Sequence, residues 1–224
     1  MRGLAFSTPI FRQLVEFQSY TYTYILGCEK TRQAVIIDPV DKTADRDIQL
    51  LKDFDLNLVY GLNTHVHADH ITGTHLLRKA FPSMKSVLSR ASGGKADRLV
   101  DDGEDVQFGE QKLEVRATPG HTNGCVTYVW HELRRAFTGD SLLVRACGRT
   151  DFQEGNAAAL IFIGHNYNGI LQTSVLEEKN LNPRLTKTEE KFLETMENLH
   201  LAHPKQLDEA VPANMKDGEV ENSS

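Results

Sequence analysis

The feature that most constrains this chain is a stretch of seven residues, Thr64-His65-Val66-His67-Ala68-Asp69-His70. It directly follows residues 56–62, an apolar and partly β-branched run that is typical of a buried strand. Because alternate residues leave a turn on the same side, His65 and His67 can face one space. We expect Asp69 and His70 to open the apolar helix that follows and to point back toward the same space.

This residue set is typical of a metal site. Imidazole nitrogen suits zinc, iron, copper or nickel, and an added carboxylate favours zinc or iron. The alternative is a polar loop with surface histidines, because nine histidines in 224 residues make a chance pair easy. Three histidines and an aspartate within six residues, at the end of a strand, are a much rarer coincidence.

The composition is that of one ordinary globular domain spanning residues 1–224, with 40% apolar and 25% charged residues. A net charge of −6 argues against nucleic acid or an anionic membrane as a partner. The three cysteines, Cys28, Cys125 and Cys147, form no close pair and predict free thiols in a reducing compartment. Residues 1–9 lack the apolar core of a secretory signal and only weakly favour an organelle-targeting arm.

The apolar periodicity predicts a mixed α/β fold. Three segments rich in β-branched and aromatic residues predict an antiparallel meander, at 10–15, 20–27 and 33–39. Apolar residues three and four apart predict helices at 43–55 and at 71–81, the second ended by Pro82. Further strands are expected at 86–89, 105–108, 112–117, 125–130 and 135–140.

Two more strands deliver candidate ligands. His121 lies in a tight Pro-Gly loop after strand 112–117, and Asp140 ends strand 135–140. Asp140 could instead cap a turn, but a strand, a turn and a ligand recur here as they do at His65. For Asp38, two roles stay open: it starts a turn, or it accepts a hydrogen bond that orients a histidine.

The motifs T-H-x-H-x-D-H, T-P-G-H-T and F-T-G-D resemble those of the metallo-β-lactamase superfamily. Its fold is an αβ/βα sandwich of two mixed sheets flanked by helices. Residues 147–153, 182–185 and 210–215 resemble the glutathione persulfide dioxygenases, the sulfur dioxygenases linked in humans to ethylmalonic encephalopathy. Glyoxalase II, a hydrolase of glutathione thioesters, is similar in chemistry.

The resemblance implies one Fe²⁺ per chain, with zinc as a possible substitute, held by His65, His121 and Asp140. Such a face leaves three adjacent positions on iron for the substrate sulfur and dioxygen. Hydrolases of the superfamily complete a two-metal site with residues that match His67, Asp69, His70 and His165. In this chain we expect those four residues to hydrogen-bond the ligands and bound waters instead.

The substrates implied are glutathione persulfide and O₂, which give sulfite and glutathione in sulfide catabolism. Arg149, Thr150 and Asp151 are expected to contact this substrate or to brace their loop, because a guanidinium can hold a glutathione carboxylate with two hydrogen bonds. The resemblance further implies the mitochondrial matrix, with the cytoplasm as alternative, and is compatible with a homodimer.

The chain departs from the resemblance between Glu154 and His165. Roughly fifteen residues are missing there, most of a helix and its turn, which should leave apolar sheet surface uncovered. Asn166 also stands where the family has aspartate. Two alternatives to the dioxygenase therefore stay open: a glyoxalase II-like hydroxyacylglutathione hydrolase with two metals bridged by Asp140, and an inactive shortened relative.

The C-terminal third is expected to be helical. Residues 186–189 predict a capping box, and a stripe of Phe192, Met196 and Leu199 is expected to pack on the sheet. Residues 217–224 are expected to fray.

Overall fold

The computed structural model describes residues 9–151, 153 and 172–220. One sheet has the order β1-β2-β3-β4-β5-β6, with strands Ile10–Val15, Tyr22–Gly27, Gln33–Ile37, Asn57–Leu62, Lys85–Ser89 and Arg98–Val100. The other has the order β10-β9-β8-β7, with strands Arg135–Phe137, Val126–Trp130, Gln111–Ala117 and Asp105–Phe108.

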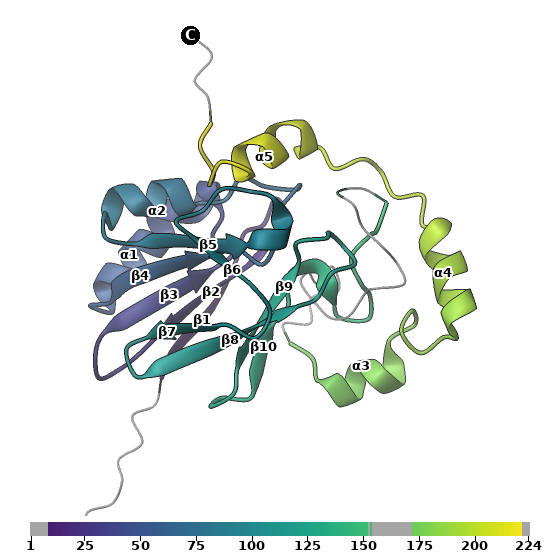
Figure 1. Ribbon diagram of the computed structural model, residues 1–224, viewed down its shortest axis with the longest axis horizontal. Coiled ribbons are helices and arrows are strands. Elements are labelled where there is room, and N and C mark those ends of the chain that lie inside the picture. The colour runs from purple at the N-terminus through teal and green to yellow at the C-terminus, as the bar shows by residue number, and fades with distance from the viewer. Residues whose placement is uncertain (1–8, 152, 154–171, 221–224) are drawn as a thin grey trace, which may run out of the picture.

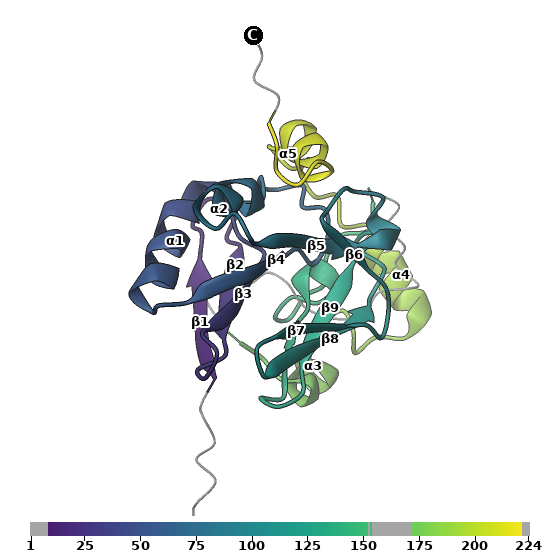
Figure 2. The same ribbon diagram turned by 60° about the vertical axis from the view of Figure 1, so that its left-hand side comes forward.

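The helices lie around these sheets (Figure 1 and Figure 2). They are α1 Ala44–Asp53, α2 Thr74–Ala80, α3 Val175–Leu181, α4 Glu189–Glu197 and α5 Leu207–Asn214, with short 3₁₀ turns at Asp41–Thr43, Arg90–Ser92 and Gly139–Ser141. In the figures α1 and α2 cover the side of the first sheet that faces away from the second sheet. Within the described residues, no helix is long and apolar enough to cross a membrane.

The connections of the first sheet bring the candidate metal ligands after β4 and Asp38 to one edge of the sheet. Strands β1, β2 and β3 form the predicted antiparallel meander, and β3 to β6 run parallel. Parallel neighbours need crossover connections, which α1 supplies between β3 and β4. The carboxyl ends of β3 and β4 therefore lie side by side, and the backbone N–H of Asp38 donates to the carbonyl of Leu62 at 2.9 Å. Asp38 thus lies beside the histidine loop.

Alternation along β3 divides the core into two layers. Val35 and Ile37 belong to a cluster shared with Tyr128 and Trp130 of β9, between the sheets. Ala34 and Ile36, on the other face, pack with residues of the helices such as Leu51 and Leu77. Strand β3 is buried on both faces, as expected for a central strand of a layered α/β fold.

The second predicted helix begins later than expected. It starts at Thr74 instead of residue 71, because Ile71 accepts a hydrogen bond from the N–H of Asp41 at 3.0 Å and Thr72 forms a β-bridge with Val40. The prediction that Asp69 and His70 open this helix was therefore wrong, and both lie in the loop before it.

Two strand predictions also need correction. The strand expected to run to residue 140 ends at Phe137, because Gly139 adopts a left-handed backbone with φ 51° and starts a 3₁₀ turn that contains Asp140. Strand β6 at Arg98–Val100, where no strand was predicted, pairs in parallel with β5. Tertiary pairing overrides a weak local preference there.

The C-terminal predictions were partly wrong. Helix α4 begins at Glu189 after Thr188, and the hydroxyl of Thr186 donates to the carbonyl of Asn182, so the predicted capping box does not form. The stripe of Phe192, Met196 and Leu199 packs on Cys147, not on the sheet. The expectation of a frayed end fails at residues 217 and 218, which are buried.

Candidate metal centre

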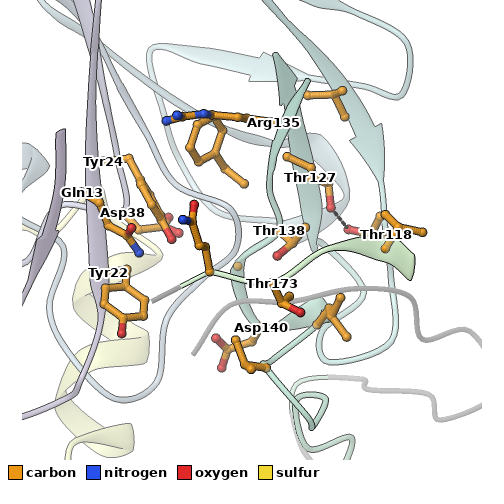
Figure 3. A pocket seen from close by; sticks show the side chains of 18 of the residues that line it. Gln13, Tyr22, Tyr24, Asp38, Thr118, Thr127, Arg135, Thr138, Asp140 and Thr173 are labelled. Atoms are coloured by element: carbon orange, nitrogen blue, oxygen red, sulfur yellow. Dashed lines mark hydrogen bonds between the residues drawn. The ribbon is translucent and has the colours of Figure 1, made fainter. Parts of the chain in front are cut away.

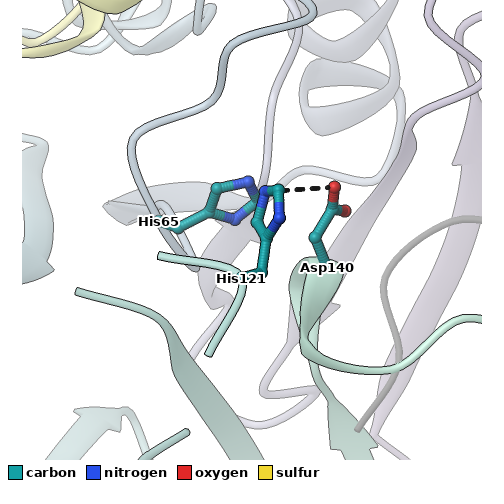
Figure 4. A group of neighbouring side chains, drawn as sticks. All are labelled: His65, His121 and Asp140. Carbon is teal, nitrogen blue, oxygen red and sulfur yellow. Dashed lines mark ion pairs between the residues drawn. The ribbon is translucent and has the colours of Figure 1, made fainter. Parts of the chain in front are cut away.

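Three strand ends bring His65, His121 and Asp140 together, as predicted (Figure 4). His65 lies in the loop after β4, His121 in the loop between β8 and β9, and Asp140 in the turn after β10. One possible ligand atom from each lies within 4.8 Å of the others, and Nε2 of His121 is 3.5 Å from Oδ2 of Asp140. Both histidines are at most 4% exposed. The three donors can therefore share one ion.

The hydrogen bond of His121 fixes which ring nitrogen faces the site. Nδ1 of His121 lies 2.7 Å from the backbone carbonyl of Arg149. A carbonyl oxygen only accepts, so Nδ1 carries the hydrogen and the lone pair of the neutral ring is on Nε2, the atom that faces Asp140.

The hydroxyl of Thr64, which lies between Asp38 and His65, likewise fixes which ring nitrogen of His65 carries the hydrogen. The hydroxyl of Thr64 donates to Oδ2 of Asp38 at 2.9 Å, which uses its only hydrogen. Nδ1 of His65, 3.0 Å from that hydroxyl, must then donate to it, and Nε2 keeps the lone pair. Burial first, and the neighbouring His67 second, hold the pKa of His65 well below its usual range. His65 is thus a neutral base, the form that binds a metal.

Asp38 takes the second of its two open roles. Its Oδ1 accepts from the N–H of Thr64 at 2.7 Å and lies 3.1 Å from Nε2 of His67. Its backbone adopts a left-handed φ of 48°, a conformation unusual for a residue other than glycine and often found at functional sites. The carboxylate therefore orients the histidine loop from β3.

A second cluster adjoins the first. His67, Asp69 and His70 also offer ligand atoms within 4.8 Å of one another, and the rings of His67 and His70 are 4.3 Å apart. Nδ1 of His70 lies 3.2 Å from both the hydroxyl of Thr21 and Oδ1 of Asp69. Burial works against a charged His67, but the charge and hydrogen bond of Asp38 outweigh it and raise the pKa of His67. His165, the fourth predicted member, is outside the described residues.

The residues present fit a metal ion. Nδ1 of His67 and Nε2 of His70 are buried and have no hydrogen-bond partner, which is costly unless an ion or a bound water satisfies them. In the first cluster, both histidines have Nδ1 committed to the protein, which is how metal-binding histidines are usually held. Two imidazoles and one carboxylate are a donor set for iron or zinc.

Arg149 braces its loop in this structure. Its guanidinium donates to both carboxylate oxygens of Asp151 at 2.6 Å and to the carbonyls of Leu201 and Ala202. Arg149, Thr150 and Asp151 are not among the residues that line the cavity beside the metal candidates. Their contact with substrate remains a prediction, while the carbonyl of Arg149 already has a role in orienting His121.

Sequence reasoning missed several contributors to the site. The role of Thr64 was overlooked, although a hydroxyl directly before a ligand histidine is a usable signal. The carbonyl of Arg149 leaves no signal, because every residue has one. Gly148 is required by close approach, since a Cβ there would lie 2.3 Å from the carbonyl of Asp140 and 2.9 Å from the ring of His121.

A cavity of about 810 Å³ opens beside the candidate metal ligands (Figure 3). Asp140 and His67 lie on its wall, as do Thr127 and Val129. Since Val126, Tyr128 and Trp130 point into the core, Thr127 and Val129 are on the outer face of β9. Part of that face thus lines the cavity. The expectation that the shortened segment leaves sheet surface uncovered stays a prediction, because residues 154–165 are outside the described part of the chain.

Comparisons with known proteins show the family of this chain. The model of the metallo-beta-lactamase superfamily matches residues 83–186. The mitochondrial persulfide dioxygenase ETHE1 of Bos taurus is 50% identical over 225 residues, covering 93% of this chain and 89% of that protein. A probable hydroxyacylglutathione hydrolase of Schizosaccharomyces pombe is 35% identical over 143 residues, covering 62% and 55%. The crystal structure of ETHE1 from Myxococcus xanthus superposes with a TM-score of 0.88 at 45% identity, covering 94% and 100%.

The chain therefore belongs to the metallo-β-lactamase superfamily and, within it, to the family of the persulfide dioxygenases. The bovine alignment runs over 225 positions, whereas 93% of 224 residues is about 208. The relative thus has about 17 aligned residues without a counterpart here, which agrees in size with the predicted shortening. Residues 154 to 165, where that shortening was predicted, are outside the described part of the chain.

Proposed function

We propose that this chain is a persulfide dioxygenase that converts glutathione persulfide, dioxygen and water into glutathione, sulfite and two protons. The main support is that one ligand atom each of His65, His121 and Asp140 lies within 4.8 Å of the others, in a chain that is 50% identical to a persulfide dioxygenase. A ferrous ion held by these three residues would supply adjacent positions for the substrate sulfur and dioxygen.

The protein's own contribution is to fix the donors before the substrate arrives. Asp38, through Thr64, and the carbonyl of Arg149 prevent the rings of His65 and His121 from turning, so little reorganisation is needed on binding. Two neutral imidazoles and one carboxylate offset a single positive charge. A divalent ion would keep a net positive charge there, which favours an anionic persulfide.

The cavity beside the site gives the rest of the substrate a place. Its volume is in the range of pockets that hold molecules of this size. Arg135 lies on one side of the cavity and Asp140 on the other in Figure 3, and the Arg135 guanidinium stacks on Phe11 at 3.9 Å. We propose that Arg135 attracts a carboxylate of the glutathione part, while the sulfur reaches the site at Asp140.

The test is oxygen consumption by iron-loaded protein with glutathione persulfide, together with measurement of sulfite. The expected result is one sulfite for each dioxygen consumed. Protein that holds one iron per chain and consumes no oxygen would contradict the proposal. The names of its relatives also support an action in mitochondria, which fractionation of cells would test. The homodimer compatible with the family resemblance stays a prediction, which the mass of the protein in solution would test.

A two-metal thioester hydrolase is the second candidate, favoured by the His67, Asp69 and His70 cluster beside the first. Two ions bridged by Asp140 could activate a water for hydrolysis. This function predicts two metal ions per chain and turnover of S-lactoylglutathione without oxygen. Elemental analysis and that assay separate it from the dioxygenase.

A further inference from the structure

Helix α5 docks on the histidine loop from a distant part of the chain. Ala210 and Ala213 of α5 form a buried cluster with Ile71, the residue that directly follows His70. Figure 1 and Figure 2 show α5, in yellow, at the end of the molecule next to α2, which follows this loop. The contact joins residues more than a hundred positions apart in sequence, so it depends on the complete fold.

Asn214, the last residue of α5, reaches the loop with its whole side-chain amide. Its Nδ2 donates to the carbonyl of His67 at 2.9 Å and to the carbonyl of His70 at 2.8 Å. Its Oδ1 accepts from the N–H of Thr72 at 2.8 Å. All three bonds are buried, and Asn214 is 5% exposed. One side chain therefore holds both ends of the segment that carries His67, Asp69 and His70.

The chemistry of these three bonds requires a carboxamide. Two carbonyls need donors and one N–H needs an acceptor, and Asn offers both kinds in a plane of fixed shape. Aspartate would keep the bond to Thr72 but would turn an acceptor toward the carbonyls of His67 and His70. Alanine would leave buried groups without this partner, and such groups are costly.

The residues after α5 hold it in place. Asp217, which is buried, forms an ion pair with Arg78 of α2. The backbone carbonyl of Met215 accepts from the N–H of Lys95 at 2.9 Å. Gly218 has φ 83°, and a Cβ there would lie 2.6 Å from the carbonyl of Thr72, so only glycine fits this approach. The segment is thus anchored at several points around Asn214.

We propose that Asn214 is a positioning residue of the metal centre. By holding the carbonyls of His67 and His70 it fixes the peptide planes that directly follow these two histidines, and with them the directions of the loop's histidines. The C-terminal helix is then a working part of the metal site, even though it supplies no ligand. This inference concerns how firmly the loop holds a metal and stands whether or not the chain oxidises a persulfide.

The test compares Asn214→Ala and Asn214→Asp with the unchanged protein, loaded with iron without oxygen or with zinc. The rate at which a coloured chelator removes the metal should rise about tenfold in both variants, as when groups behind a ligand are removed. Hydrogen exchange at the Thr72 amide should accelerate in the alanine variant and stay slower in the aspartate variant, which keeps that one bond.

Leu51→Ala is the control for general loss of stability, because Leu51 is fully buried on the inner face of α1, in a core cluster that contains no residue of the histidine loop. It should lower the melting temperature without changing the rate of metal loss. If both Asn214 variants melt lower but release metal at the original rate, the positioning role is wrong. If Asn214→Asp behaves like the unchanged protein, Asn214 only fills space and the proposal also fails.

Discussion

The two neighbouring histidine clusters differ in how the protein treats their nitrogens. In the first, Nδ1 of His65 and of His121 each has a hydrogen-bond acceptor, and Nε2 of His121 lies 3.5 Å from Oδ2 of Asp140. In the second, one nitrogen of His67 faces Asp38, and the other, like Nε2 of His70, is buried without a partner. The same residue types can therefore be prepared to different degrees for a metal.

The pKa values of the histidines also differ between the two clusters. The pKa of His65 is lowered mainly by burial, whereas Asp38 outweighs burial and raises the pKa of His67. A metal competes with protons for the lone pair, so the first cluster is the better site near neutral pH. Each cluster offers two histidines and one aspartate, so the two clusters differ in how the ligands are prepared and not in the number of histidines.

The largest effect is expected from His121→Ala, which removes a ligand from the first cluster. Iron content should fall well below one per chain, and sulfite production should drop on the order of 10³-fold or more, because both reactants lose their shared position. Elemental analysis and oxygen uptake check this. A variant that keeps its iron and its rate would show that the first cluster is not the site.

Thr64→Val tests the preparation of the first cluster without removing a ligand. The valine keeps the shape but ends the relay from Asp38 to His65, so metal affinity should fall about 10- to 100-fold. Competition with a chelator measures it. The matched control is Thr43→Val, whose hydroxyl is outside both clusters and donates to the carbonyl of Val40 at 3.3 Å; it should leave the affinity unchanged.

His70→Gln tests the second cluster. If the chain is a one-metal dioxygenase, iron content should stay at one per chain and the rate should fall by less than about tenfold, because only a residue behind the ligands is changed. Loss of one of two bound metals, together with loss of thioester hydrolysis, would instead support the two-metal hydrolase.

A smaller effect is expected from Arg149→Lys. A single ammonium group cannot replace the two parallel bonds to Asp151, so the loop that carries the carbonyl partner of His121 should loosen. We expect a few-fold rise in the rate of metal loss, whereas a role confined to substrate binding would change KM alone. Steady-state kinetics beside the chelator assay separates the two.

Asp47 lies outside both clusters, so a substitution there should leave metal binding unchanged. This residue instead makes stability depend on pH. Burial raises its pKa to about 6, although Arg46 opposes the shift. The folded state then binds more protons than the unfolded state between pH 4 and 6, so this group's contribution to stability falls as pH rises through that range. The unfolding free energy of Asp47→Asn, relative to that of the unchanged protein, should therefore be about 2 kcal/mol higher at pH 7 than at pH 4.

Urea unfolding of both metal-free proteins at the two pH values measures this difference. An equal difference in unfolding free energy at pH 4 and pH 7 would contradict the raised pKa. Metal affinity of the variant should match that of the unchanged protein, which keeps the test independent of both clusters.

Much of the fold followed from local pattern. The β-branched and aromatic residues of 10–15, the alternation in 112–117 and the 3.6-residue period of α1 predicted their elements, because all of these depend on neighbours in sequence. Strand β6 and the late start of α2 could not be predicted in this way. Arg98–Val100 is a strand because β5 lies beside it, and residues 71 and 72 are held by hydrogen bonds from a segment thirty residues earlier.

For this protein, the sequence by itself determined the kind of site: which residues carry nitrogen and oxygen donors, and that each follows the end of a strand. Only the tertiary structure decided that His65, His121 and Asp140 meet, that Asp38 accepts hydrogen bonds from the loop, and that Asn214 holds it from the C-terminal helix. The physical reason is that ligand identity is a property of single residues, whereas the direction of a lone pair is set by partners that folding brings from far along the chain.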